Sequence, residues 1–164
     1  MASRLLGEKE WLHDVTEDDR SDRRGAFVSL HINDELRGCV GVLDSQKAIV
    51  ETVVAMALGA SFEDPRFPPL TLEELPRVRF EISLITPPVA IASVDQIVAG
   101  RDGVVVTSGT RRALLLPQVA SQLGGSVTEF LDAACRKAGL VSGAWRSPDT
   151  RIETFTAEVF AEEH

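Results

Sequence analysis

The sequence predicts an α+β fold with a mainly antiparallel sheet packed against helices. About six segments have the alternating hydrophobicity of strands, and most come in pairs joined by short turns rich in Gly, Asn and Asp. The strands do not alternate one for one with helices, which argues against a doubly wound parallel sheet. The 164 residues, 44% of them hydrophobic, are enough for one domain with a substantial core and no disulfide or metal support.

Composition excludes several classes of function. Seventeen basic and 25 acidic residues give a net charge of −8, which disfavours binding to DNA or to an anionic membrane surface. No apolar run approaches the ~20 residues that span a bilayer. Two cysteines and an amino terminus unlike a signal peptide indicate a cytoplasmic protein. Three dispersed histidines, and the absence of CxxC and phosphate-binding glycine motifs, predict neither a metal nor a cofactor.

Residues 1–24 differ in character from the rest of the chain. The first fifteen can form a short helix with four apolar side chains on one side: Leu5, Leu6, Trp11 and Leu12. Residues 16–24, TEDDRSDRR, are mostly charged and lack apolar side chains, which predicts an exposed, mobile segment. We therefore expect the packed domain to cover residues 25–164.

The first two predicted strands form a hairpin. Residues 27–32 alternate between two faces, residues 33–35 are turn material, and residues 36–43 return. Gly38 and Gly41 interrupt the second strand. Glycine inside a strand often marks a bulge or a place where a ligand or another backbone comes close.

An apolar helix is predicted next, over residues 46–60. Asp44 or Ser45 can cap its amino terminus. Its apolar positions exceed one narrow stripe, so we expect the helix to be largely buried.

The segment after this helix is shaped by prolines. Three prolines between residues 64 and 69 forbid a regular helix. Thr71 and Glu74 form a capping box, which predicts one helical turn that ends before Pro76. Residues 77–85 then alternate strictly and give the clearest strand of the chain.

The last part of the chain contains shorter elements. Two further capping boxes begin at Ser93 and Ser126, and Gly139 is placed to end the second of these helices. The predicted elements are a short helix through residue 98, strands 104–107 and 112–116, a helical stretch 118–123, a helix ending at residue 138, and a terminal strand 151–160.

Leu36-Arg37-Gly38-Cys39-Val40-Gly41 is the most informative stretch for chemistry. Cys39 lies between glycines, which shield it little, and on a regular strand Arg37 would point to the same face and favour the reactive thiolate. His31 lies across the hairpin, within a few residues of facing Cys39, and is a candidate base. The alternative is a small buried cysteine in a hairpin that uses glycine for tight packing.

The proline loop is the second candidate, with Asp64, Arg66 and Phe67 held in order for a binding rim. The alternative is a helix stop with an internal Asp64–Arg66 ion pair and Phe67 filling the core. Gln118, after the strand that ends in Leu116-Pro117, could orient a ligand or cap the following helix.

Together these stretches resemble one family. The sequence is similar to the AmmeMemoRadiSam system protein A family, whose unit is the AMMECR-one domain, over about residues 25–160, and the hexapeptide at residues 36–41 is the family signature, with Val40 where Ile is more usual. Family members usually begin with a longer apolar helix, which the charged segment interrupts here. The other matching stretches are Gly25 to Leu30, Asp64 to Leu70, Glu81 to Thr86, Leu115 to Ala120 and Lys137 to Leu140, with Trp145, Phe155 and Phe160 near the end.

The resemblance implies an α+β domain of two unequal lobes, with the signature hexapeptide at a cleft between them. It implies association with a Memo-like protein and a radical S-adenosylmethionine enzyme. It also favours a site lined by matching residues: Arg37, Cys39, Asp64, Arg66 and Gln118.

Three functions are consistent with these patterns. The leading one is an accessory or binding module of a radical-enzyme system that holds a small substrate, peptide or partner at Arg37 and Cys39, with Gly38, Gly41, Asp64, Arg66, Phe67 and Gln118 as binding residues. The second is an enzyme with Cys39 as nucleophile or redox centre, Arg37 stabilising charge, and His31 or Asp64 handling protons. The third, a regulatory RNA-binding protein, is disfavoured by the net charge of −8. The sequence leaves the ligand and the oligomeric state open.

Overall fold

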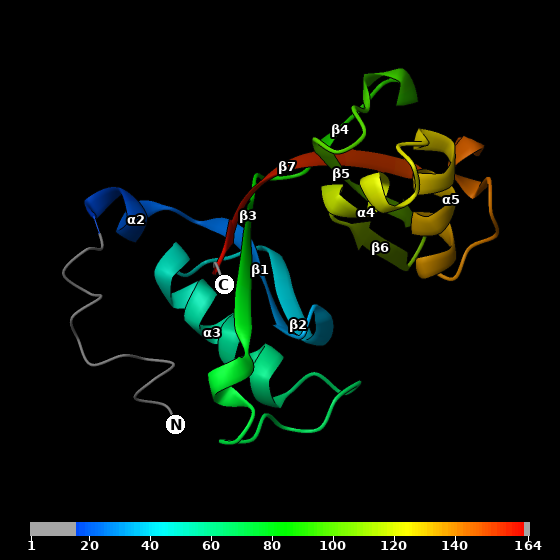
Figure 1. The fold of residues 1–164 in the computed structure, drawn as a ribbon. Coiled ribbons are helices and arrows are strands. Elements are labelled where there is room, and N and C mark those ends of the chain that lie inside the picture. The colour runs from blue at the N-terminus through cyan, green and yellow to red at the C-terminus, as the bar shows by residue number, and fades with distance from the viewer. Residues whose placement is uncertain (1–15, 163–164) are drawn as a thin grey trace. The chain divides into compact units, whose positions relative to one another are not determined.

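The computed structural model describes residues 16–162 and divides the chain into two compact units (Figure 1). Of the described residues, the first unit contains 16–85 and 158–162, and the second contains 86–157. Strand β7 (Arg151–Ala161) contributes to both. The strands of each unit pair antiparallel, so the predicted α+β class with a mainly antiparallel sheet is confirmed. Among the described residues, no helix has the length and apolar character needed to cross a membrane.

The first unit is built on three strands in the order β2-β1-β3, covered on one face by helix α3. These elements are β1 (Arg24–Ile32), β2 (Glu35–Asp44), β3 (Arg79–Ile85) and α3 (Ile49–Phe62). The hairpin turn has two residues rather than the predicted three. Asn33 and Asp34 both have positive φ, 51° and 66°, which matches the tight turn that suits the twist of paired strands.

Helix α3 begins three residues later than predicted, and its N-cap is Ala48 rather than Asp44 or Ser45. The Ser45 hydroxyl serves other partners: it is hydrogen-bonded to the Thr52 hydroxyl (2.6 Å) and accepts the Lys47 N–H (3.0 Å). The expectation that the helix is largely buried is only partly right. Five of its fourteen residues are buried: Ile49, Thr52, Gly59, Ala60 and Ser61.

The charged segment before β1 contains a helix that the sequence analysis missed, α2 (Glu17–Ser21). Thr16 and Asp19 form a reciprocal capping box, which stabilises the start of this short helix. The Asp22 carbonyl then accepts the N–H of Ile49 at 2.9 Å and ties the segment to the start of α3. The residues of α2 are exposed or half-exposed, as expected. The helix predicted for residues 1–15 lies outside the described residues.

The segment between α3 and β3 runs through turns and a short 3₁₀ helix, η2 (Leu75–Arg77). The Thr71–Glu74 capping box is present, with the Thr71 N–H donating to Glu74 at 2.9 Å. It opens turns and η2, which contains Pro76, rather than a helical turn that ends before this proline. Proline is tolerated there because the first residues of a helix need no N–H donor.

The second unit contains strands in the order β4-β7-β5-β6 and most of the remaining helices. Its strands besides β7 are β4 (Val89–Ala90), β5 (Asp102–Ser108) and β6 (Arg111–Leu115). Its helices are η3 (Val94–Gln96), α4 (Pro117–Gln122), α5 (Val127–Lys137) and η4 (Ala144–Arg146). The two-residue β4 was not predicted. The capping box at Ser93 marks the start of η3 as expected, although η3 ends before residue 98. Ser126 caps α5 by accepting the Glu129 N–H, which is one half of the predicted capping box.

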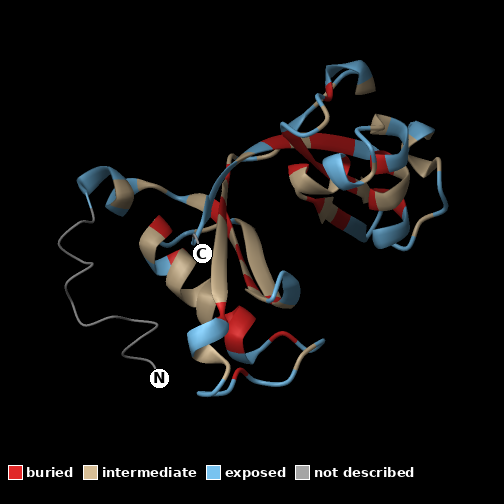
Figure 2. Ribbon diagram, viewed as in Figure 1, coloured by how far each residue is buried: buried red, intermediate tan, exposed pale blue. Residues whose placement is uncertain are grey.

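A continuous apolar core fills the second unit, between its strands and α5 (Figure 2). Phe130, Leu131 and Ala134 of α5 are fully buried, as are Val104 and Val106 of β5. The α5 helix supplies this face because its apolar residues recur at three- and four-residue spacing.

Candidate functional site

The hexapeptide at residues 36–41 lies on β2, the outer strand of the first unit's sheet. Its register against β1 slips once: Leu30 is opposite Gly38, but His31 is opposite Leu36. Arg37 is therefore the extra residue of a β-bulge, and a bulge turns a side chain away from the regular alternation. The assumption of a regular strand, which placed Arg37 beside Cys39, does not hold here.

Two side chains of the proline loop hold the backbone of Cys39. Its N–H donates to Asp64 Oδ2 at 2.9 Å, and its carbonyl accepts from Arg66 Nη2 at 3.3 Å. Because both backbone groups are bonded to loop side chains, this loop occupies the place that another strand would take. An outer strand covered in this way cannot pair with a foreign chain at that residue.

The Asp64–Arg66 pair is well fixed. Arg66 donates from Nε to Asp64 Oδ1 at 3.0 Å and from Nη2 to Oδ2 at 2.7 Å, so the pair is bidentate. The Asp64 side chain is 3% exposed, and its pKa lies well below the usual range, chiefly because of the Arg66 hydrogen bonds. Arg66 remains exposed, and its guanidinium lies 5.4 Å from the centre of the Phe67 ring. Phe67 thus packs beside a charged group at the loop surface.

Arg37 is held by a residue that the sequence analysis assigned only to helix capping. Its Nε and Nη2 donate to the two carboxylate oxygens of Glu74, at 2.8 and 3.1 Å. A longer contact of 3.4 Å joins Nη2 to the Pro69 carbonyl. The pKa of Glu74 is lowered to about 2, first by Arg37 and then by the Thr71 N–H. The Thr71–Glu74 box was a signal for Glu74, but it gave no indication of a partner 37 residues away.

Both glycines that flank Cys39 are explained by packing within the first unit. A Cβ on Gly38 would stand 2.2 Å from the Ala60 carbonyl oxygen of α3. A Cβ on Gly41 would stand 2.1 Å from the Phe27 ring, which lies across that position. The close approach expected at these glycines is therefore made by the protein itself.

The Cys39 side chain is half-buried on the sheet face opposite α3. Val40 contacts Gly59 of α3, so its neighbour Cys39 points the other way. The residue opposite Cys39 is Ser29, and the residue opposite Ser29 on β3 is Glu81. His31 is opposite Leu36 and Arg79 instead, and its Nε2 is buried with no hydrogen-bond partner among the described residues.

Gln118 belongs to α4 in the second unit, so it does not share a compact unit with Cys39. The second cysteine, Cys135, lies in that unit too, fully buried, and burial raises the pKa of its thiol. In residues 16–162 no cluster of three or more His, Cys, Asp or Glu has the arrangement of a metal site.

The arrangement supports binding more directly than acid–base chemistry. The two carboxylates that hydrogen-bond to Cys39 and Arg37, those of Asp64 and Glu74, are each engaged by an arginine that holds them ionised. A carboxylate with a strongly lowered pKa is a weak proton acceptor near neutrality. What the site presents is a fixed strand carrying a half-exposed thiol beside a hydroxyl.

Comparison with known proteins gives a consistent result. The AMMECR1 family model matches residues 2–160. The chain is 43% identical over 152 residues to Protein MK0488 of Methanopyrus kandleri, which covers 87% of this chain and 73% of that protein. It is 39% identical over 150 residues to Protein MJ0810 of Methanocaldococcus jannaschii, covering 87% and 75%.

The structural comparison agrees. The crystal structure of uncharacterized protein PH0010 from Pyrococcus horikoshii matches with a TM-score of 0.86 and 35% identity, over 99% of this chain and 88% of that one. The family match begins at residue 2, so it includes the amino-terminal segment that was expected to lie outside the packed domain. This chain belongs to the AMMECR1 family.

Proposed function

We propose that this protein is an accessory or binding module of a radical S-adenosylmethionine system of the AmmeMemoRadiSam type. In this proposal the part of β2 around Arg37 and Cys39 holds a small substrate, a peptide or a partner protein on the sheet face that carries the thiol. The observation that carries it is the pair of contacts from Asp64 and Arg66 to the Cys39 backbone. These contacts fix the backbone of the strand and leave the Cys39 thiol half-exposed on the sheet face that points away from α3.

A strand fixed in this way is suited to binding because little freedom remains to be lost when a ligand docks. Arg37 and Glu74 extend the same support along the strand, with their side chains 13% and 21% exposed. Since these charges are already paired, a ligand would contact the thiol and its neighbours on the sheet face rather than the ion pairs.

A cysteine-dependent enzyme is the second candidate, and one observation favours it. The Arg66 guanidinium lies close enough to Cys39 for the two charges to interact, and this interaction contributes to the raised pKa of Arg66, after the larger effect of Asp64. A nearby guanidinium favours a thiolate. In this candidate Cys39 is the nucleophile or redox centre. The residue opposite Cys39 is Ser29, whose hydroxyl is not a base, so another group must accept the thiol proton.

The test uses the protein with Cys39 blocked by N-ethylmaleimide, mixed with the Memo-like protein and the radical enzyme from one source organism. Complex formation is measured by calorimetry and size-exclusion chromatography. We expect blocking to weaken binding at least tenfold, and Cys39→Ser treated with the same reagent to bind like the untreated protein. Equal binding by the blocked and the untreated protein would reject a binding role for the part of β2 around Cys39.

The same samples separate the two candidates. A binding module keeps its affinity in Cys39→Ser, because serine preserves the shape of the site. An enzyme loses turnover in Cys39→Ser while complex formation continues. Cys135 is a built-in control, since its burial protects it from the reagent in the folded protein.

A further inference from the structure

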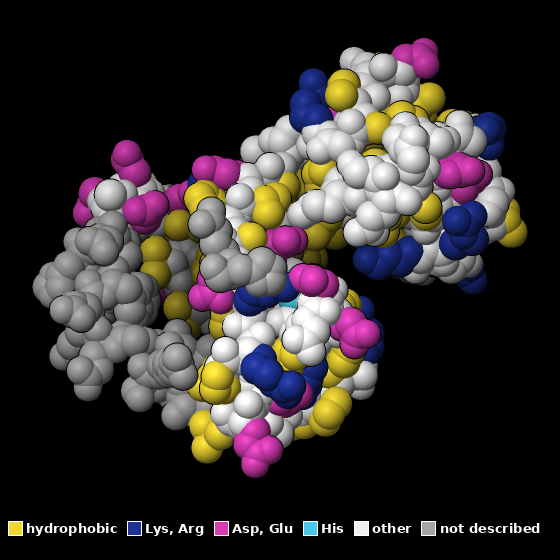
Figure 3. Space-filling model, in the orientation of Figure 1, with side chains coloured by type: hydrophobic (Ala, Val, Ile, Leu, Met, Phe, Trp, Pro, Cys, Tyr) yellow, Lys and Arg dark blue, Asp and Glu magenta, His cyan; other side chains and the backbone are white. Residues whose placement is uncertain are grey.

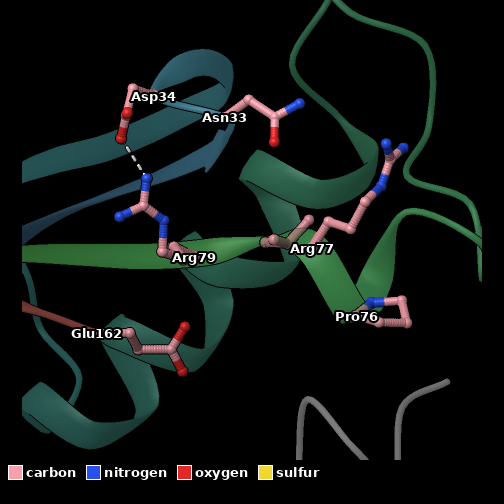
Figure 4. A pocket seen from close by; sticks show the side chains of 7 residues that line it. Asn33, Asp34, Pro76, Arg77, Arg79 and Glu162 are labelled. Carbon is pink, nitrogen blue, oxygen red and sulfur yellow. Dashed lines mark hydrogen bonds and ion pairs between the residues drawn. The ribbon is translucent and has the colours of Figure 1, made fainter. Parts of the chain in front are cut away.

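A second site candidate lies at the hairpin end of the first unit, apart from the loop contacts at Cys39. A hollow of about 860 Å³ opens between the β1–β2 turn, η2 and the start of β3 (Figure 4). This volume is within the range of small-molecule pockets, roughly 300–1,000 Å³. All of its lining residues belong to the first unit.

One part of this hollow is rich in hydrogen-bond donors. Arg77 is exposed, and its guanidinium has no ion pair or hydrogen bond within residues 16–162. Figure 4 shows its side chain pointing away from Arg79, toward the side where the Asn33 amide lies. Arg79 is held by an ion pair with Asp34 across the turn. An arginine and an amide together favour a carboxylate, which can accept bidentate hydrogen bonds.

A smaller hollow of about 150 Å³ adjoins the first and is rich in acceptors. The two share Asp34, Arg79 and Glu162, and the smaller one adds His31 and Glu81. Three carboxylates against one guanidinium leave it with a net negative charge. His31 Nε2 is buried without a partner among the described residues, and buried polar atoms normally have one. A cationic group in this hollow would balance its negative charge.

We propose that the two hollows together bind a zwitterion of the short-peptide class. Its carboxylate lies at Arg77 and Asn33, and its ammonium group lies in the smaller hollow near Glu162 and His31. The ligand is neutral overall, so the net charge of −8 does not oppose its approach. Acidic and basic side chains both occur on the visible face of the first unit (Figure 3).

The size of the hollows favours a peptide over a single amino acid. An extended chain advances about 3.3–3.6 Å per residue, so two to four residues separate the terminal charges by roughly 7–14 Å. In Figure 4 Arg77 and Glu162 lie on opposite sides of the larger hollow, and the proposed ligand extends from one side to the other. This site is independent of the function proposed for Cys39.

The test is calorimetric titration with triglycine, N-acetyl-triglycine and triglycine amide. We expect triglycine to bind at least tenfold more tightly than either blocked form. Arg77→Gln should bind triglycine and its amide equally, and Glu162→Gln should bind triglycine and its acetyl form equally. Lys47 lies just after β2, away from the hairpin turn. Lys47→Gln removes one positive charge there and should leave the affinity for triglycine unchanged.

The outcomes are decisive in both directions. Loss of the terminal-group preference in the matching variant, with an unchanged melting temperature, supports the assigned polarity. The proposal fails if glycine peptides of two to four residues give no saturable signal with the full chain. It also fails if the blocked forms bind as well as triglycine, or if Lys47→Gln weakens binding as much as Arg77→Gln.

Discussion

The two units are stabilised in different ways. The second has a continuous core of ten buried residues, including Phe130, which is fully buried. Among the described residues, the central apolar cluster of the first has four buried members: Leu30, Ala60, Leu70 and Val78. The first unit supplements it with ion pairs that reach across its loops, such as Arg37–Glu74. The candidate site lies in the first unit, where Arg37, Asp64, Arg66 and Glu74 fix one another by ion pairs and hydrogen bonds.

One polar arrangement recurs in both units. Asp64 and Asp102 are both buried aspartates held bidentately by an exposed arginine, Arg66 and Arg101 respectively. Each also accepts a backbone N–H, from Cys39 at 2.9 Å and from Val98 at 2.8 Å. The difference is in what they hold: Asp102 closes a local turn, whereas Asp64 joins segments 25 residues apart. Only Asp64 supports a strand that carries a candidate functional residue, Cys39.

The largest expected effect is on the core of the second unit. Phe130→Ala should lower the free energy of unfolding by about 3–5 kcal/mol, because it removes a fully buried ring and leaves a cavity. Denaturant unfolding followed by circular dichroism measures this. Val141→Ala, at a residue 77% exposed, is the control and should change little. A loss below about 1 kcal/mol would show that the stability of the second unit does not depend on its buried apolar core at Phe130.

The next effect concerns the contact between β2 and α3 in the first unit. Gly38→Ala should lower the free energy of unfolding by about 3 kcal/mol, since the new Cβ meets a backbone oxygen that cannot move freely. Gly59→Ala is the matched control. Its Cβ meets a Val40 methyl at 3.2 Å, and alanine improves helix propensity, so the two effects offset. If Gly38→Ala is as stable as Gly59→Ala, the glycine is not required for packing.

The pH dependence of stability tests the two buried aspartates, Asp64 in the first unit and Asp102 in the second. Asp64→Asn should lower the free energy of unfolding by about 2 kcal/mol near neutrality, because an ionised hydrogen-bond acceptor is lost. The pKa of Asp64 and of Asp102 is lower in the folded protein than the unfolded value of about 3.9. Their stabilisation is therefore present above this pH and is lost as the pH falls below it.

The measurement is the unfolding free energy of the wild type and both Asn variants between pH 2 and pH 7. Each variant should show a shallower fall below about pH 4 than the wild type. If Asp102→Asn flattens the curve and Asp64→Asn does not, the contact at Cys39 contributes no stability.

The smallest effect on stability is expected at the two cysteines, which differ in reactivity instead. In the folded protein Cys39 should be alkylated at least tenfold faster than Cys135, because one thiol is half-exposed and the other fully buried with a raised pKa. Peptide mass spectrometry after timed labelling measures both rates. In denaturant the rates should converge. Equal rates in the folded state would mean that Cys39 is as protected as Cys135.

Much of the fold follows from local patterns. Alternating hydrophobicity predicted β1, β2 and β3, and the capping residues Ser93 and Ser126 predicted the starts of η3 and α5. These signals depend only on neighbours within four residues. The start of α3 was placed wrongly because Ser45 bonds to Thr52 instead of capping. The two-residue β4 is too short to produce any periodic signal.

The candidate site was only partly accessible from the sequence. An Asp64–Arg66 pair was one of two alternatives, and the pair is present. Its bonds to the Cys39 backbone could not be predicted, since they depend on where the loop lies against β2. The same is true of Glu74 as the partner of Arg37 and of Ser29 as the residue opposite Cys39.

The sequence by itself determined the fold class, the hairpin and the residues with chemical potential, because propensity, periodicity and turn chemistry are short-range properties. The tertiary structure decided which of those residues meet. The bulge at Arg37 set its direction, the helix carbonyl at Ala60 required Gly38, and the proline loop brought a buried carboxylate to Cys39. Such contacts join residues 22 to 37 positions apart, and their geometry is fixed only when α3 and the loop pack against the sheet.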